Sequence, residues 1–342
     1  IGAALVAGPV LVAQAEVKLY GHAHMSLDNV DRDVSTDSGE WFVSTNSSRF
    51  GIRAAEDLGG GLKAAAQYEF LFAQDVGTSN PVTNRDNYVG LEGGFGALRL
   101  GNIDSATKDT GGIADLFYRE QLGESRSVLS CGATCGGLDG RVANGIHYLS
   151  PKIGGGLEFK AQYGVEDSFT TDATVMALGA RWTAGPLVVG ASYLNVEDTT
   201  PPGPDQKGMR VAAKFDVGGG FTVAALWQSV SDIGNASGSD RDTIGLGASF
   251  KAGNNIFKAQ FYEADELDNA ANTGGDMVAI GWDHLFSKTT KGYVTYAKTG
   301  NDSGTNTFVV GGNGHATLMP TPSGVPNGGD TSGFSIGMIV DF

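Results

Sequence analysis

Apolar and polar residues alternate along most of this chain. In residues 17–27, valine, leucine, alanine and methionine occupy the odd positions, whereas lysine, tyrosine, histidine and serine occupy the even ones. The same alternation returns in residues 256–262 and 333–342. A period of two is the pattern of a β-strand with one apolar face and one polar face. Its repetition predicts an all-β protein.

The connections between these segments are of two kinds. Short glycine-rich turns are expected at 57–61, 93–96, 152–156, 184–186, 217–220 and 252–255. Longer polar connections are expected at 28–40, 75–84, 197–206, 232–242, 264–275 and 300–330. Tight turns at one end and long loops at the other are typical of a transmembrane β-barrel of the outer membrane.

The strand count follows from the length and from the alternation. A membrane strand with half of its two connections takes roughly 20 residues, which gives about 16 strands here. The alternation supports strands centred near Tyr20, Ile52, Tyr68, Tyr88, Leu98, Ile146, Phe159, Leu178, Gly190, Ala212, Ala224, Leu246, Phe257, Ile280, Val294 and Ile336. We therefore expect residues 16–342 to form a 16-stranded antiparallel transmembrane β-barrel. Its last strand should pair with its first, because a sheet in a membrane leaves no edge unpaired.

One connection breaks the pattern of short turns and polar loops. Residues 103–140 follow a strong strand and precede another, and they include a helix-compatible stretch at 113–122. A loop of this length inside a compact domain is usually functional. We expect it to fold inward and narrow the lumen.

Composition and charge limit the location and the partners. Residues 1–15 are almost wholly apolar and end in Ala-Gln-Ala, which is typical of a secretory signal peptide that lacks its basic start. The 53 glycines suit curved and bulged sheets better than helices. A net charge of −15 argues against nucleic acid as a partner.

The remaining candidate chemistry is sparse. Cys131 and Cys135 lie four residues apart, and in an exported chain they favour a small disulfide-closed loop. His22 and His24 share a strand face at a spacing that can bind copper or zinc, but no third ligand is evident. We expect two histidines in the lumen, no metal and no cofactor. No motif of a hydrolase or a metalloprotease occurs.

Two long motifs carry a family resemblance. The first, at 46–69, begins Asn-Ser-Ser-Arg-Phe-Gly-Ile-Arg-Ala-Ala-Glu-Asp and ends Gln-Tyr-Glu, and the second, at 85–101, begins Arg-Asp-Asn-Tyr-Val-Gly-Leu and ends Leu-Arg-Leu-Gly. The chain also ends in an aromatic residue, Phe342. With them the chain resembles the general diffusion porins of Gram-negative outer membranes. The resemblance implies a homotrimer of 16-stranded barrels, each with its third loop folded into the pore.

The resemblance also implies a charged constriction. Its wall side is assigned to Arg49, Arg85, Arg141 and His22, and its loop side to Asp115 and Glu120 first and to Asp109 and Glu124 next. The chain lacks the Pro-Glu-Phe-x-Gly stretch found on this loop in many relatives.

The alternation supports the wall assignment independently of the family. Arg49 and Arg53 share a face opposite Ile52, and an arginine facing lipid near the midplane costs roughly 2–4 kcal/mol. Both arginines should therefore face the lumen, where fixed charges set ion preference through the local field. Solvated wall residues without a role in selectivity are the alternative reading of the arginines.

These observations predict a passive water-filled channel for ions and small hydrophilic solutes, not an enzyme, in the outer membrane of a Gram-negative bacterium. The excess of acidic residues suggests a mild cation preference. A substrate-specific channel is the first alternative, and an outer-membrane enzyme or a structural or adhesion barrel is a weaker one. Expected partners are two further copies of the chain, outer-membrane lipid and lipopolysaccharide.

Overall fold

The structure is a computed structural model that describes residues 15–32, 39–73, 75, 82–118, 121–130, 138–168, 171–198, 203–311 and 324–342. Side chains are described for these residues except 166–168, 171–173 and 198. The expected signal peptide, apart from residue 15, lies outside the described residues, as do Glu120, Cys131 and Cys135.

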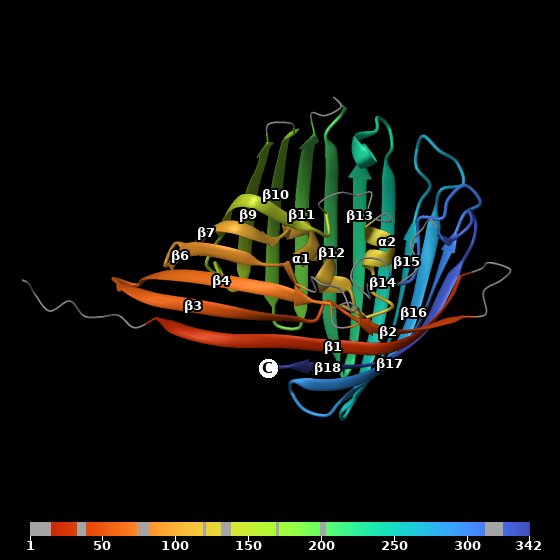
Figure 1. The fold of residues 1–342 in the computed structure, drawn as a ribbon, viewed down its shortest axis with the longest axis horizontal. Coiled ribbons are helices and arrows are strands. Elements are labelled where there is room, and N and C mark those ends of the chain that lie inside the picture. The colour runs from red at the N-terminus through yellow and green to blue at the C-terminus, as the bar shows by residue number, and fades with distance from the viewer. Residues whose placement is uncertain are drawn as a thin grey trace, which may run out of the picture.

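Antiparallel strands close into one barrel (Figure 1). Its first half comprises β1 (Glu16–Arg32), β2 (Glu40–Thr45), β3 (Arg49–Gly59), β4 (Leu62–Phe72), β5 (Val82–Asn84), β6 (Asn87–Gly93), β7 (Gly96–Asp104), β8 (Arg141–Leu149) and β9 (Leu157–Ser168). Its second half comprises β10 (Thr171–Ala184), β11 (Leu187–Asp198), β12 (Gln206–Gly218), β13 (Phe221–Ser231), β14 (Arg241–Ala252), β15 (Asn255–Ala264), β16 (Gly275–Leu285), β17 (Thr290–Asn301) and β18 (Thr331–Asp341). A short 3₁₀ turn, η2 (Ile233–Asn235), follows β13.

Eighteen strand segments make sixteen barrel strands, because two strands are each interrupted once. The first half of β1 pairs with β3 and its second half with β2, so β2 and β3 are one strand broken at residues 46–48. In the same way β5 and β6 both pair with β4 on either side of residues 85–86. The sixteen-stranded prediction is confirmed, and each predicted strand centre lies in a strand.

The barrel closes between its first and last strands, as expected. Leu27 is in register with Ile336, and Met25 with Met338. The Gly21 amide donates to the Phe342 carbonyl at 2.8 Å. Closure leaves no strand edge in the apolar phase, where an unpaired backbone group has no water to bind.

Alternation along each strand separates lipid from lumen. On β18 the side chain of Ile336 is 51% exposed, whereas that of its neighbour Ser335 is fully buried. Large apolar residues on nearly every strand are likewise exposed, which is the outward apolar band of a membrane barrel. Among the described residues, no helix is long and apolar enough to span a membrane.

The tight turns lie where glycine predicts them. Gly59, Gly60 and Gly61 between β3 and β4 have φ values of +85°, +62° and +81°. These angles are open to glycine and strained for other residues. All six predicted turns lie at one end of the barrel, at the bottom or left edge of Figure 1.

The long connection between β7 and β8 lies inside the barrel (Figure 1). We call residues 105–140 the inner loop. Its helix α1 (Ala106–Ala114) packs on β10, β11 and β12, and its helix α2 (Arg126–Leu129) packs on β15 and β16. The sequence favoured a helix at 113–122, and this was wrong. The Ser105 hydroxyl caps α1 by accepting from the Lys108 amide at 3.1 Å, and Asp115 ends the helix in an extended conformation.

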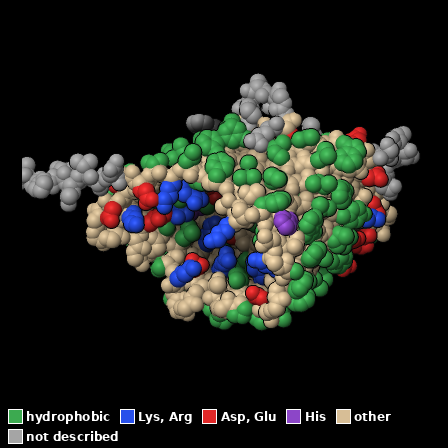
Figure 2. Space-filling model, turned by 90° about the horizontal axis from the view of Figure 1, so that it is seen from below, with side chains coloured by type: hydrophobic (Ala, Val, Ile, Leu, Met, Phe, Trp, Pro, Cys, Tyr) green, Lys and Arg blue, Asp and Glu red, His purple; other side chains and the backbone are tan. Residues whose placement is uncertain are grey.

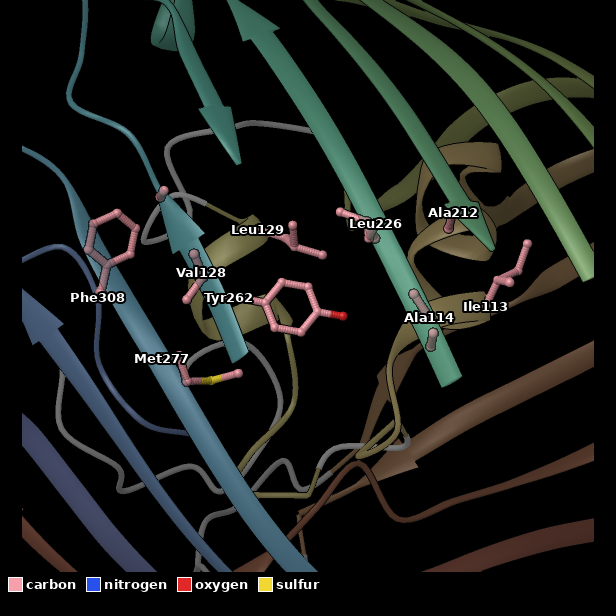
Figure 3. Packing of buried hydrophobic residues seen from close by; sticks show 11 residues of the cluster. Ile113, Ala114, Val128, Leu129, Ala212, Leu226, Tyr262, Met277 and Phe308 are labelled. Carbon is pink, nitrogen blue, oxygen red and sulfur yellow. The ribbon is translucent and has the colours of Figure 1, made fainter. Parts of the chain in front are cut away.

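An apolar core holds the inner loop against the far wall. Figure 3 shows Ile113 and Ala114 from α1, and Val128 and Leu129 from α2, beside wall residues. The buried wall members of this cluster are Ala212, Ala224, Leu226, Tyr262, Ala264 and Met277, and Phe308 joins it from the connection between β17 and β18. Because these side chains pack against the inner loop, this part of the lumen is filled. The open channel is left along the opposite wall, formed by β1 to β9.

Candidate pore constriction

Two of the predicted arginines meet on the open wall. The Arg85 guanidinium, 8% exposed, donates to the Glu69 carboxylate at 2.8 Å. The Arg49 guanidinium lies 3.9 Å from the same oxygen. The other Glu69 oxygen accepts from the Tyr20 hydroxyl at 2.9 Å. One wall carboxylate therefore holds both arginines in place.

The third predicted arginine is fixed by two further carboxylates. Arg141 donates to Asp86 at 2.5 Å and lies 3.1 Å from Asp104. Asp86 stands in the break between β5 and β6, directly after Arg85. Because the strand is interrupted here, the consecutive residues Arg85 and Asp86 both take part in charge pairs on this wall, Arg85 with Glu69 and Asp86 with Arg141. The two pairs are therefore neighbours.

The row of charges continues onto the inner loop and onto β9. The Lys108 ammonium on α1 lies 2.9 Å from Asp104, at the end of β7. The Lys160 ammonium on β9 donates to the Asp104 backbone carbonyl at 2.6 Å and to the Asp109 carboxylate on α1 at 2.6 Å. Asp109 keeps about half of its side chain open to the lumen, and enclosure by the surrounding protein raises its pKa.

We call this set the charge ladder. It consists of Arg49, Glu69, Arg85, Asp86, Arg141, Asp104, Lys108, Lys160 and Asp109. Five basic side chains face four carboxylates, which leaves a net charge of one positive. Figure 2, which looks at the tight-turn end, shows Lys and Arg side chains gathered around the hollow of this face, with apolar side chains over the outer surface.

Two other predicted residues lie beside the ladder. Arg53 donates to the neutral amide of Gln67 at 2.8 Å and stacks 4.2 Å above the Tyr20 ring. Its charge therefore adds to the positive side of this wall. His22 is buried and pairs with Asp341 at 2.6 Å, at the seam between β1 and β18.

His24, the second predicted lumen histidine, shares a hydrogen bond of 2.7 Å with the Tyr293 hydroxyl. Within the described residues, no group of three or more His, Cys, Asp or Glu side chains is placed to hold a metal ion. Both histidines belong to the barrel seam in this structure.

Asp115, the first predicted loop carboxylate, does not meet the wall arginines. One of its oxygens accepts from the Ser125 amide and hydroxyl at 2.9 and 2.8 Å, and the other from Gln260 on β15 at 3.0 Å. Burial raises the pKa of Asp115 despite these hydrogen bonds. Its physical role is to join the two arms of the inner loop to each other and to the far wall.

Glu124 also lies away from the ladder. It is buried and forms a two-pronged pair with Arg126, with one contact of 2.9 Å. Of the predicted acidic partners that the structure describes, only Asp109 reaches the channel charges. The residues that replace them, Glu69, Asp86 and Asp104, are on the wall or at the root of the loop.

A buried arginine fastens the returning arm of the inner loop. Arg210 on β12 is fully buried and contacts both Asp139 oxygens at 2.7 and 3.0 Å. It also donates to the Thr107 carbonyl at 2.9 Å and to Gln228 at 2.9 Å. Burial alone would raise the pKa of Asp139, but the charge and hydrogen bonds of Arg210 prevail and the pKa is lowered.

A second buried cation supports the turn of the loop. The Lys258 ammonium on β15 donates to the Leu116 carbonyl at 3.1 Å and to Gln121 at 2.5 Å, and it pairs with Asp283 at 3.0 Å. It also lies 4.4 Å from the centre of the Phe117 ring. Loop and wall are therefore joined by charge as well as by apolar packing.

The described part of the last long loop also reaches inward. Phe308, between β17 and β18, is fully buried in the core that holds α2, and the Arg241 guanidinium lies 5.2 Å from its ring centre. Val310 packs in the cluster that includes Leu122 of the inner loop. Two loops therefore fill the same side of the lumen.

The sequence contained a partial signal for the missed ladder residues. Glu69 alternates with the outward Tyr68, so its inward direction could be predicted. Lys160 follows the outward Phe159 in the same way. What alternation does not supply is the pairing of Asp104 with Arg141, which depends on a shift in strand register near residue 102.

A closed 16-stranded barrel with an outward apolar band, an inner loop and a charged open wall defines a channel-forming outer-membrane protein. The sequence model of the Gram-negative porin family matches residues 2–304. The chain belongs to this family.

Individual relatives agree with this assignment. The chain is 26% identical over 331 residues to the major outer membrane protein P.IB of Neisseria meningitidis serogroup A, covering 91% of this chain and 95% of the relative. It is 29% identical over 310 residues to outer membrane porin protein 32 of Delftia acidovorans, covering 85% and 86%.

Solved structures share the fold. The anion-selective porin from Comamonas acidovorans superposes with a TM-score of 0.77 at 22% identity, covering 96% of this chain and all of that one. The trimer form of OmpT from Vibrio cholerae gives 0.69 at 17% identity, covering 96% and 99%. Membership of this family makes the protein an outer-membrane channel for small solutes.

Proposed function

We propose that the channel is a passive, water-filled pore whose constriction lies at the charge ladder, and that it weakly prefers anions. The observation that carries this proposal is the charge balance of the ladder, one positive charge with Arg53 beside it. Ion preference follows the local field at the narrowest point rather than the total charge. The proposal therefore departs from the mild cation preference suggested by the composition.

The geometry of the ladder also favours polar solutes. Its arginines and Lys160 are spread along the wall from β3 to β9 beside three wall carboxylates, and Lys108 and Asp109 stand on the facing helix. A solute passing the ladder therefore meets charges of both signs. The structural neighbour from Comamonas acidovorans is an anion-selective porin, which supports the same direction of preference.

We further propose that three copies assemble in the membrane and contact outer-membrane lipid and lipopolysaccharide. The exposed apolar residues on nearly every strand supply the surface for both contacts. A Vibrio structural neighbour is described as a trimer form. Mass measurement of the protein extracted in mild detergent tests the assembly: a monomer under all such conditions would contradict it.

The channel itself is tested in planar lipid bilayers with purified protein. We expect ohmic single-channel currents and, across a tenfold KCl gradient, a zero-current potential with the sign of chloride preference. Absence of any open channel would refute the proposed function. A potential of the opposite sign would refute the anion preference alone.

A further inference from the structure

A separate cavity of about 370 Å³ lies beneath α1, at the tight-turn end of the barrel. Its walls come from the helix side of the inner loop and from the ends of β8, β9 and β10. The volume is in the range that binds small organic molecules. The cavity adjoins the ladder at Lys160 and Asp109, which line one side of it.

Two charged side chains of this cavity have no partner among the described residues. Arg181 on β10 and Glu158 on β9 both line it, and they are direct neighbours in the strand register. No ion pair within 4.0 Å and no hydrogen bond of either side chain occurs in the described part of the chain. Other charges at this constriction are paired: Lys160 with Asp109, for example. The cavity thus offers one free cation and one free anion side by side.

The cavity also has an apolar side, which is unusual in a lumen. Tyr118 is 38% exposed, and it is the only large hydrophobic residue in the described part of the inner loop with more than a third of its surface open. Its ring lies over Gly112, where an added Cβ would come within 3.1 Å of it. Ile113 of α1 borders the same side of the cavity. Water-lined parts of a barrel lumen are usually polar.

We propose that this cavity is a subsite for α-amino acids with an apolar side chain. The neighbouring carboxylate and ammonium of the solute match the neighbouring Arg181 and Glu158, because residues in direct register hold their Cβ atoms about 5 Å apart. The Arg181 guanidinium can bind a carboxylate with two parallel hydrogen bonds. The solute side chain lies against Tyr118 and Ile113. The inference rests on the proposed function, since the cavity is reached through the channel.

The competing ligand chemistries fit less well. A simple organic anion would bind Arg181 but would leave Glu158 facing a second carboxylate. An organic cation would bind Glu158 but would leave Arg181 facing a second positive charge. A zwitterion without an apolar body, such as glycine, would satisfy both charges but would not cover the Tyr118 ring.

Block of the KCl current by phenylalanine tests the proposal. The matched probes are phenylpropionate, which lacks the ammonium, phenethylamine, which lacks the carboxylate, and glycine, which lacks the ring. We expect phenylalanine to block at the lowest concentration of the four. Either Arg181→Gln or Glu158→Gln should raise its half-blocking concentration about tenfold, the usual cost of a charge-assisted hydrogen bond. Lys251→Gln, which removes a charge at the same end of the barrel outside the cavity, should leave block unchanged.

Two results would overturn the subsite. They are equal block by phenylalanine and phenylpropionate, or equal block in wild type and both cavity variants. Ohmic conductance without such discrimination would leave the proposed channel intact. If no variant conducts, saturation-transfer NMR of phenylalanine with the wild-type protein in micelles decides: no transfer contradicts the subsite, and transfer that glycine does not displace supports it.

Discussion

Replacing Arg210 by methionine should release the inner loop without unfolding the barrel. The substitution keeps an unbranched apolar stem but removes the guanidinium, which contacts Asp139 at 2.7 and 3.0 Å and the Thr107 carbonyl at 2.9 Å. Asp139 is then left as a buried carboxylate without its cation. Breaking a buried pair in this way costs about 3–5 kcal/mol.

That cost can be translated into a change in loop position. Each 1.4 kcal/mol is a factor of ten, so the detached loop should become about two to nearly four orders of magnitude more populated. The strand ladder does not depend on Arg210, and the barrel should remain folded. Single-channel recordings should then show larger current fluctuations and closure at lower voltage than in wild type.

Two further variants make this prediction specific. Arg210→Met combined with Asp139→Leu removes both charges, and a pair replaced by apolar groups of similar size is often nearly neutral, so the current should become quiet again. Lys298→Met breaks the exposed pair with Asp330 at 2.7 Å, which is worth at most about 1 kcal/mol, and should change nothing. Current fluctuations in Arg210→Met that are no larger than those of the wild type would refute the reasoning.

Three other predictions concern the loop and the channel charges. Lys258→Met should raise current noise less than Arg210→Met, because Asp283 is still paired with Lys291 at 2.9 Å after Lys258 is removed. Equal noise of the two variants in single-channel recordings would contradict this. Acidification from pH 7 should increase anion selectivity, because protonation of Asp109 leaves the charge of Lys160 uncompensated. The pKa of Asp109 is raised, so this step should occur at a pH above the usual carboxyl value of about 4. Asp109→Asn should lack that step in zero-current potentials measured against pH. Gly281→Val should displace the inner loop and alter conductance, because a Cβ there would lie 2.7 Å from the Phe117 ring; an unchanged conductance would show that the loop is not packed as described.

The sequence was sufficient to predict the barrel because strands and turns follow from local patterns of residues. Alternation located every strand centre, and glycine located six tight turns, since both depend on neighbouring residues only; the short β16–β17 connection at 286–289 contains no glycine and was not predicted. The breaks at 46–48 and 85–86 were not predicted, although the second places Arg85 and Asp86 in adjacent charge pairs.

The constriction was predicted only in part. The wall arginines have directions fixed by strand alternation, and Arg49, Arg85 and Arg141 do lie together on one wall. The inner loop has no such period. Its position depends on long-range contacts, such as the one between Asp115 and Gln260, 145 residues apart, which local sequence does not reveal.

The most direct test of the central claim is the zero-current potential of a variant with Arg49, Arg85 and Arg141 all replaced by glutamine. Removing three positive charges leaves the ladder with two more carboxylates than bases, so the sign should reverse to cation preference across a KCl gradient. Lys251→Gln, which removes a positive charge outside the ladder, should leave the potential unchanged. A triple variant with the wild-type potential would contradict the account.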